Sequence, residues 1–369
     1  MKRRPSHLFS RALLVAPLVP LALLTGLVLV GCPTLKNAPL DAGAETDAGI
    51  ADLDAGDDAS ELPETGFTIV RHMPEAGALR ALSVTTTEQV YLAGDDGVIL
   101  EKAGAEWQTV VLGPGVDVTG IWSSGSTEAL AVATQKNTNK GPIFRRGNGV
   151  WAQIGTAPHG LRTVWGIDRI RYAGGNDGVI YSGPPNDPLG NGFQLPLPPN
   201  VADTLFAPII YAIGGNSTKA VMAAADADST LFSTDGTTWR LFEDPIDRTR
   251  SFRTMWGFPG PTVQIYQGAN YYGLWSFTSP GGPVFQLNEE KDQLQNPNRW
   301  IWGIWGPSGD QIVCVGDAGR IMTYDKKTGK VLIRPSPTVK NLYAVGGTSL
   351  DDIWIVGEEQ LVLHGHLSL

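Results

Sequence analysis

One short phrase recurs seven times along this chain of 369 residues and restricts its fold more than any other feature. Successive copies begin 39, 43, 49, 42, 49 and 41 residues apart. Self-similarity at such a period indicates an architecture of repeated units that pack against one another. The copies, which begin at residues 79, 118, 161, 210, 252, 301 and 342, are Leu79–Val84, Val118–Ser123, Leu161–Gly166, Ile210–Gly215, Phe252–Gly257, Ile301–Gly306 and Leu342–Gly347.

The columns of this phrase have a consistent physical character. The first position is always a large apolar residue, the fourth is Leu, Ile, Val or Met, and the third is Ala, Gly or Thr. A strand that packs against neighbours on both faces is apolar on both sides, and small residues suit a place where strands crowd toward a common axis. We therefore predict that each copy is the innermost strand of a blade.

Further strand signals follow the copies. An apolar segment ending in Gly comes next, as in Val90–Gly94, and a pair such as Asp96-Gly97 favours a tight hairpin into a third strand. Four short strands per repeat indicate an all-β, seven-bladed β-propeller of antiparallel blades over residues 66–369. An outer strand led by an aromatic residue is expected at Trp107, Trp151, Phe193 and Trp239.

The last repeat is one strand short, because the chain ends at Leu369 after three strand signals. The segment Gly66–Val70 precedes the first repeat and has an aromatic residue, Phe67, where the outer strands have theirs. We predict that residues 66–73 join the last blade and close the ring, which would hide two exposed strand edges.

The N-terminus carries an export signal. Four basic residues and no acidic ones lie in residues 1–31, and an apolar run extends from Leu13 to Val30. This order is typical of a signal peptide. The last residues before and including Cys32 (Leu-Val-Gly-Cys) resemble a bacterial lipobox, and that resemblance implies cleavage before Cys32 and attachment of lipid to it.

An uncleaved membrane helix is the alternative, since an apolar run of 18 residues nearly spans a bilayer. Pro17 and Pro20 disfavour such a helix. Aspartate after the lipidated cysteine is an inner-membrane retention signal in enteric bacteria, so Pro33 at this position favours the outer membrane. We expect a lipid-anchored protein of the cell envelope that contacts the bilayer through its lipid.

Residues 32–65 have the composition of a tether. Residues 33–65 carry nine acidic residues, one basic residue and no aromatic residue, so they cannot bury enough apolar surface to offset the entropy of ordering. The tether holds most of the chain's net charge of -9. Without a basic face to displace counterions from phosphates, nucleic acid is excluded as a partner.

The repeat resembles that of uncharacterised myxobacterial β-propeller lipoproteins, in which L-x-x-V-W-G is followed by D-x-W-x-V-G and a glycine hairpin. It is also distantly similar to Ycf48-like assembly factors and to Asp-box propellers. Ser233–Trp239 is one residue shorter than the usual Asp-box, S-x-D-x-G-x-T-W. The resemblance covers residues 66–369 and implies a propeller fold, with little indication of activity.

The second position of the phrase is the variable one, and it marks the start of each inner strand. Arginine and aromatic side chains at one mouth of the channel could bind a carboxylate, phosphate or sugar. Alternatively, each arginine pairs with a carboxylate of a neighbouring blade and each aromatic residue fills a gap. The residues are Arg80, Thr119, Arg162, Tyr211, Arg253, Trp302 and Tyr343, of which all but Thr119 are candidate ligand-binding residues.

Three long connections are expected on the same side and could carry recognition: Leu195–Pro208, Glu243–Arg250 and Leu287–Arg299. The Trp-Gly pairs of the phrase recur in register, which favours an architectural role in the core. Those tryptophans are Trp122, Trp165, Trp256 and Trp305.

No catalytic constellation, cofactor site or metal site is predicted. His364 and His366 alternate on one strand without a third ligand nearby, and the turns at Asp95–Gly97 and Asp226–Asp228 have too few ligands for a calcium loop. No G-x-S-x-G elbow occurs, and Cys314 lies in an apolar segment typical of a core. A sialidase-like site is disfavoured because three symmetrically placed arginines do not match its arginine triad.

These observations favour a monomeric, non-enzymatic recognition or scaffold protein that binds a protein or glycan at one face of the ring. A propeller hydrolase or lyase acting on glycans is the alternative from another class. A third is an assembly factor for an envelope complex. Two carboxylates in a cleft would distinguish the hydrolase from a binding protein.

Overall fold

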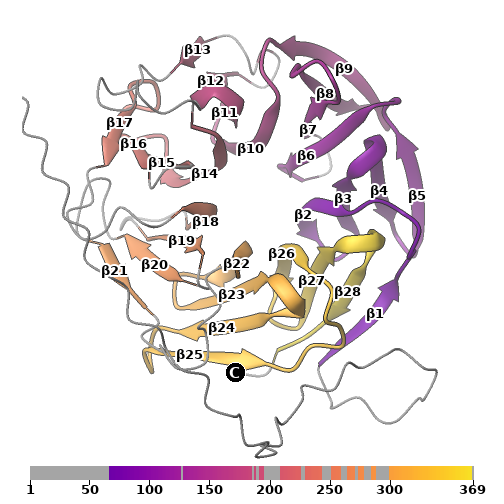
Figure 1. The fold of residues 1–369 in the computed structure, drawn as a ribbon, viewed down its shortest axis with the longest axis vertical. Helices are drawn as coiled ribbons and strands as arrows, with labels where there is room; N and C mark the ends of the chain where they lie inside the picture. The colour runs from indigo at the N-terminus through magenta and orange to yellow at the C-terminus, as the bar shows by residue number, and fades with distance from the viewer. Residues whose placement is uncertain are drawn as a thin grey trace, which may run out of the picture. The chain divides into compact units, whose positions relative to one another are not determined.

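The computed structural model describes residues 66–125, 128–184, 187, 191–194, 208–225, 229–242, 251–258, 264–270, 273–277, 284–287 and 299–367. They lie in the compact unit Ala59–Leu369, whose strands form seven four-stranded sheets. The sheets are antiparallel blades in a ring (Figure 1), so the predicted seven-bladed β-propeller is confirmed. The predicted signal peptide, Cys32 and the predicted tether of residues 32–65 lie outside the described residues.

The repeated phrase forms the inner strand of every blade, as its small and apolar columns predict. Gly120 and Gly303 show why the third position is small: a Cβ atom there would lie 3.0 and 2.8 Å, respectively, from the backbone of the next blade's inner strand. The inner strands face the centre of the ring (Figure 1). They are β2 (Leu79–Thr86), β6 (Val116–Ser123), β10 (Leu161–Ile167), β14 (Ile210–Ser217), β18 (Phe252–Gly257), β22 (Ile301–Ser308) and β26 (Leu342–Ser349).

The second strands are the most completely buried elements, since each packs between two neighbouring blades. All six residues of the strand Ala220–Ala225 are buried, which the near-continuous apolar character of such strands requires. The second strands are β3 (Gln89–Gly94), β7 (Ala129–Gln135), β11 (Ile170–Gly175), β15 (Ala220–Ala225), β19 (Ile265–Ala269), β23 (Gln311–Gly316) and β27 (Asp352–Gly357).

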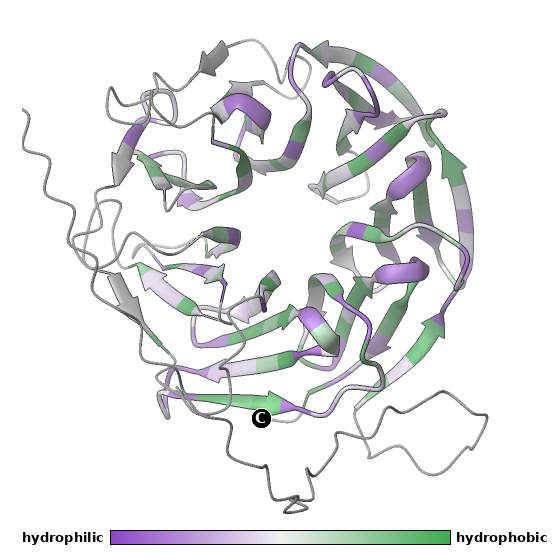
Figure 2. Ribbon diagram, in the orientation of Figure 1, coloured by the Kyte–Doolittle hydropathy of each residue, from purple (hydrophilic) through white to green (hydrophobic). Residues whose placement is uncertain are grey.

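Within the described residues, a one-turn 3-10 segment links the second strand to the third in four blades. Its middle residue has a left-handed conformation, with φ of 57° at Asp96 and 59° at Asp177, which Asp adopts more readily than most residues. These polar turns are hydrophilic beside strands that carry hydrophobic residues (Figure 2). They are η1 (Asp95–Gly97), η2 (Asn176–Gly178), η3 (Asp317–Gly319) and η4 (Glu358–Gln360).

The third strands continue each blade outward and pair antiparallel with both neighbours. They are β4 (Val98–Ala103), β8 (Gly141–Gly147), β12 (Val179–Gly183), β16 (Ser229–Ser233), β20 (Leu274–Phe277), β24 (Ile321–Asp325) and β28 (Val362–Gly365).

The outer position of the last blade is filled by the N-terminal strand. Phe67 of this strand lies opposite Gly365 and is buried in a cluster that includes Leu363 and Leu367. The pairing expected from the orphan aromatic residue is therefore observed. The outer strands are β1 (Phe67–Arg71), β5 (Glu106–Val111), β9 (Val150–Ala157), β13 (Asn191–Gln194), β17 (Arg240–Phe242), β21 (Val284–Gln286) and β25 (Lys330–Arg334).

The hydrophobic core lies between adjacent blades. One cluster joins Tyr91 and Ala93 of the first blade to Ile121 and Ala131 of the second. Each blade therefore depends on its neighbours for burial, as expected of a repeat protein. No helix in the described part of the chain has the length and apolarity needed to cross a bilayer.

Candidate functional site

The second position of the repeated phrase is a β-bulge in every blade. The pairing between the inner and second strands skips this residue each time, for example between Leu79 and Ala81 and between Leu342 and Ala344. A bulged residue is left out of the ladder and its side chain is re-aimed. The same shift occurs in the other five blades. This backbone feature explains why the second position tolerates Arg, Thr, Tyr and Trp.

The first residue of the 3-10 turn holds the bulged side chain in several blades. Asp95 accepts two hydrogen bonds from Arg80, and its Oδ2 also accepts one from the backbone N–H of Ala78 at 3.0 Å. Trp302 Nε1 donates to Asp317 Oδ1 at 2.6 Å. One polar turn residue thus fixes both the start of the inner strand and the side chain beside it.

The same arrangement recurs in two further blades. Tyr343 Oη donates to Glu358 Oε1 at 3.2 Å, and Arg162 Nε donates to Asn176 Oδ1 at 3.0 Å. Among the described contacts, Arg80 pairs with a carboxylate, that of Asp95. Its partner belongs to its own blade and not, as expected, to a neighbouring blade, because the turn returns to the start of the inner strand.

Side chains from five consecutive blades make contact along one side of the channel. The Arg80 guanidinium lies 5.3 Å from the ring centre of Tyr343, which meets Trp302 edge-on at 6.0 Å. Trp302 stacks on Trp300 at 5.7 Å. The contacts continue from Trp300 to Arg253, so this row spans much of the mouth.

The Arg253 guanidinium occupies a cage of aromatic rings. It lies 3.8 Å from the ring centre of Tyr211, 4.7 Å from that of Trp300 and 5.9 Å from that of Trp302. Cation–π attraction within about 6 Å stabilises such contacts. We call the residues of the row and of this cage together the mouth arc: Arg80, Tyr211, Arg253, Trp300, Trp302 and Tyr343.

Burial and charge both act on the ionisable groups of the mouth arc. Burial opposes the charge of Arg80, but the hydrogen bond and negative charge of Asp95 outweigh it and raise the pKa of Arg80. Burial and the nearby Glu358 carboxylate raise the pKa of Tyr343. At neutral pH the arc therefore presents a cationic arginine beside a neutral phenol.

The mouth arc opens into a central cavity of about 290 Å³ lined by residues of all seven inner strands. Five of the six predicted binding residues line it: Arg80, Tyr211, Arg253, Trp302 and Tyr343. Arg162 is not among the lining residues. Thr119 is not either, since its hydroxyl donates to the carbonyl oxygen of Leu161 at 2.6 Å. The arc therefore covers one side of the mouth instead of a complete ring.

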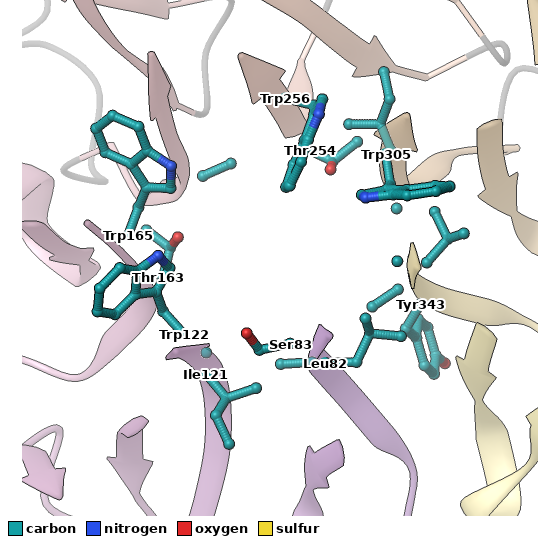
Figure 3. Close-up of a pocket in the computed structure, with 18 of the residues that line it drawn as sticks. Leu82, Ser83, Ile121, Trp122, Thr163, Trp165, Thr254, Trp256, Trp305 and Tyr343 are labelled. Atoms are coloured by element: carbon teal, nitrogen blue, oxygen red, sulfur yellow. The ribbon is translucent and has the colours of Figure 1, made fainter. Parts of the chain in front are cut away.

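The recurring tryptophans also line the cavity, which the sequence reasoning missed by assigning them to the core. Figure 3 shows all four around the open centre. Three are half-buried, and Trp305 is buried. We call them the tryptophan collar: Trp122, Trp165, Trp256 and Trp305.

The collar has an architectural role as well, as its recurrence suggested. A Cβ atom at Gly166 would lie 2.8 Å from Cζ2 of Trp122, and one at Gly347 would lie 3.1 Å from Cη2 of Trp305. The glycine at position six of the phrase in one blade therefore accommodates the indole of the preceding blade. The sequence does not show this double role, because the surroundings of each indole depend on how the blades are arranged in the ring.

His364, one of the two histidines considered as metal ligands, has structural partners. His364 Nε2 lies 2.9 Å from Asp352 Oδ1, and its ring stacks on Trp354 at 3.9 Å. Within the described ranges no group of three or more His, Cys, Asp or Glu side chains is placed to hold a metal ion. The acidic segment Asp226–Asp228 lies outside the described residues.

The Asp-box-like segment is a structural turn, as expected. Asp235 Oδ1 accepts hydrogen bonds from the backbone N–H groups of Thr237 at 2.8 Å and Thr238 at 2.6 Å. These bonds lower the pKa of Asp235. The three long connections, residues 195–208, 243–250 and 287–299, lie almost entirely outside the described residues.

Solved propellers share this fold at low sequence identity. Ycf48 bound to D1 peptide is similar with a TM-score of 0.60 and 13% identity, over 83% of this chain and 99% of that one. Ycf48 from Cyanidioschyzon merolae gives 0.61 and 14%, over 81% and 98%. The WD40 β-propeller domain of Doa1 gives 0.63 and 13%, over 82% and 98%.

No family model and no curated protein sequence matches the chain. The distant similarity to Ycf48-like propellers predicted from the repeat is therefore confirmed in the fold, whereas the resemblance to myxobacterial lipoproteins stays a prediction. Identities of 13% and 14% establish shared architecture and no shared activity. The chain has the β-propeller fold of Ycf48 and of WD40 domains.

Proposed function

We propose that this protein is a lipid-anchored recognition propeller of the cell envelope, acting as a monomer that binds a protein partner through the mouth arc. The observation that carries the proposal is the contiguous row of arginine and aromatic side chains along the cavity mouth. Trp, Tyr and Arg are the residues most enriched at the energetic centres of protein interfaces.

Pre-organisation of the arc supports the same proposal. The turn residues Asp95, Asp317 and Glu358 hold Arg80, Trp302 and Tyr343, respectively, before any partner arrives. Side chains already fixed lose less conformational entropy on binding. The arc is thus a rigid surface on a rigid scaffold.

The described lining of the cavity favours binding over hydrolysis. Neither Asp nor Glu is among the described residues that line it, whereas most glycoside hydrolases use a pair of carboxyl groups. The solved structure of Ycf48 with D1 peptide shows that a propeller of this architecture can hold a peptide. A role in assembling an envelope complex is the form of partner binding that this similarity suggests.

The test compares partners captured by matched variants. The lipidated protein would be purified from envelope membranes as the wild type, as Trp302→Ala/Tyr343→Ala, and as Arg169→Ala. Arg169 is an exposed arginine in the turn at the other end of an inner strand. A partner lost only with the arc variant supports the proposal. Full retention of every partner by a folded arc variant contradicts it.

The anchor has its own test, since it depends on residues outside the described range. Cys32→Ser is expected to abolish both incorporation of labelled palmitate and cleavage before residue 32. A wild-type protein that incorporates no palmitate and keeps residues 1–31 would favour the uncleaved helix. This outcome is independent of the mouth arc.

A further inference from the structure

The cavity has a second chemical zone below the mouth arc. Position five of the repeated phrase lies three residues beyond the bulge, which is about 10 Å along an extended strand. Tryptophan occupies this position in four blades, and Ser83, Gly214 and Gly346 occupy it in the other three. The tryptophan collar is therefore at a different depth from the arginines.

The collar consists of two pairs of indoles on different sides of the opening. Figure 3 shows Trp122 beside Trp165 on one side, Trp256 and Trp305 on the other, and Ser83 facing the opening between Trp122 and the far pair. Only a hydroxymethyl group and a glycine fill position five in the first and last blades. The result is a space with aromatic walls and a gap between them.

The collar level carries hydroxyl groups and no charge among the described lining. Arg80 and Arg253 are the only charged residues that line the described cavity, and both belong to the mouth arc. The polar side chains near the collar are hydroxyls, such as Ser83, Thr163 and Thr254. Ser83 Oγ lies 2.8 Å from Ser123 Oγ and accepts a hydrogen bond from the Ser123 backbone N–H at 3.1 Å. These two bonds leave at least one lone pair of the hydroxyl pair available as an acceptor.

A guanidinium beside the collar, that of Arg171, is already neutralised. Arg171 lies 4.2 Å from the ring centre of Trp122, and its Nη2 donates to Glu128 Oε2 at 2.8 Å. Arg171 is buried with 4% of its surface exposed. It positions the indole and is not available to bind an anion, so the collar suits an uncharged ligand.

We propose that the tryptophan collar binds an uncharged sugar residue of a glycan, as a site separate from the protein-binding mouth arc. A pyranose ring has an apolar C–H face that stacks on indole and equatorial hydroxyls that pair with serine and threonine. Ligand sites combine apolar and aromatic walls with a few placed polar groups in this way, in cavities of about 300 Å³ and more. An apolar peptide would use the indoles but leave the hydroxyls unmatched.

The test uses an array of uncharged oligosaccharides of glucose, xylose and N-acetylglucosamine, with saturation-transfer NMR on the hits. The Trp165→Ala variant removes one wall, and Ser83→Phe fills the gap without removing a tryptophan. Trp107→Ala is the matched control, since Trp107 lies on the outer strand β5.

A fall of about tenfold or more in the affinity for an uncharged oligosaccharide, in both collar variants, supports the proposal. Tenfold corresponds to about 1.4 kcal/mol. Trp107→Ala is expected to bind within about twofold of the wild type. Should Trp165→Ala not fold, Ser83→Phe decides. No uncharged glycan bound at millimolar concentration, or glycan binding unaffected by the folded collar variants, overturns it. Binding of an apolar peptide alone at the collar also overturns it and leaves the mouth arc untouched.

Discussion

The guanidinium of Arg171 in the third blade lies 4.2 Å from the ring centre of Trp122 in the second blade. The same guanidinium donates two hydrogen bonds to Glu128, which precedes strand β7 of that second blade. A wall of the central cavity therefore depends on a buried ion pair that joins two blades. Stability and ligand binding are coupled at this point.

We expect Arg171→Met to destabilise the protein by about 3 kcal/mol or more, because it leaves the Glu128 carboxylate buried without its partner. The double variant Arg171→Met/Glu128→Leu is expected to recover most of this loss, since apolar residues of similar size can replace a buried pair. Urea unfolding of the three proteins measures both values. Equal loss in the single and double variants would contradict the ion-pair explanation.

The N-terminal strand offers a matched pair of substitutions. Phe67→Ala is expected to cost about 3 kcal/mol, because Phe67 is 4% exposed within the last blade's core. Ile69→Ala, two residues further along the same strand, is expected to cost less than about 1 kcal/mol because Ile69 is 45% exposed. Thermal unfolding compares the two. Deletion of residues 66–73 should lower the melting temperature sharply, and equal melting of all variants would contradict strand β1 as the support of the last blade.

Asp352 is expected to make stability depend on pH. Burial opposes its ionisation, but hydrogen bonds from Thr348 at 2.7 Å and from the His364 ring at 2.9 Å outweigh burial and lower its pKa. A carboxyl whose folded pKa lies below the unfolded value, about 4, stabilises the fold above that value and loses this contribution as pH falls.

The free energy of unfolding would be measured between about pH 6 and about pH 3, an interval that covers the titration of Asp. Asp352→Asn should show a smaller loss of stability on acidification than the wild type. Asp310→Asn is the control, because Asp310 is an exposed residue in a turn. Identical acid profiles for the wild type and Asp352→Asn would refute the assignment.

Cys314 is expected to be inert in the folded protein. Complete burial raises the pKa of this thiol, so the reactive thiolate is scarce and shielded. Ellman's reagent should label Cys314 in a chain lacking residues 1–32 only after denaturation. Rapid labelling under native conditions would show that strand β23 opens or that the thiol is exposed.

The sequence specified the fold through the periodic phrase. Its always-apolar first and fourth columns and its small third column are visible in residues such as Leu79 and Gly120, and they require packing on both faces of a strand near an axis. Phe67 and the missing last strand likewise predicted the pairing of β1 with β28. Burial and steric crowding restrict the residues of each strand directly, so this pattern is visible in the sequence.

The candidate site was predicted only in part. The variable second column pointed to five residues that line the cavity, but it also included Arg162, which does not. Trp300 was missed because it lies one residue before the phrase, and it reaches the arc by stacking on Trp302. Neither difference has a signal in the spacing of the repeat.

By itself the sequence determined the number of blades, their strand order and the column of the phrase that varies. Tertiary structure alone decided which of these side chains meet, since Arg253 contacts Tyr211 and Trp302 only after their blades become neighbours in the ring. It also decided that the collar tryptophans both pack between blades and face the cavity. The physical reason is that periodic burial is written along one strand, whereas a site depends on where bulges and neighbouring blades direct each side chain.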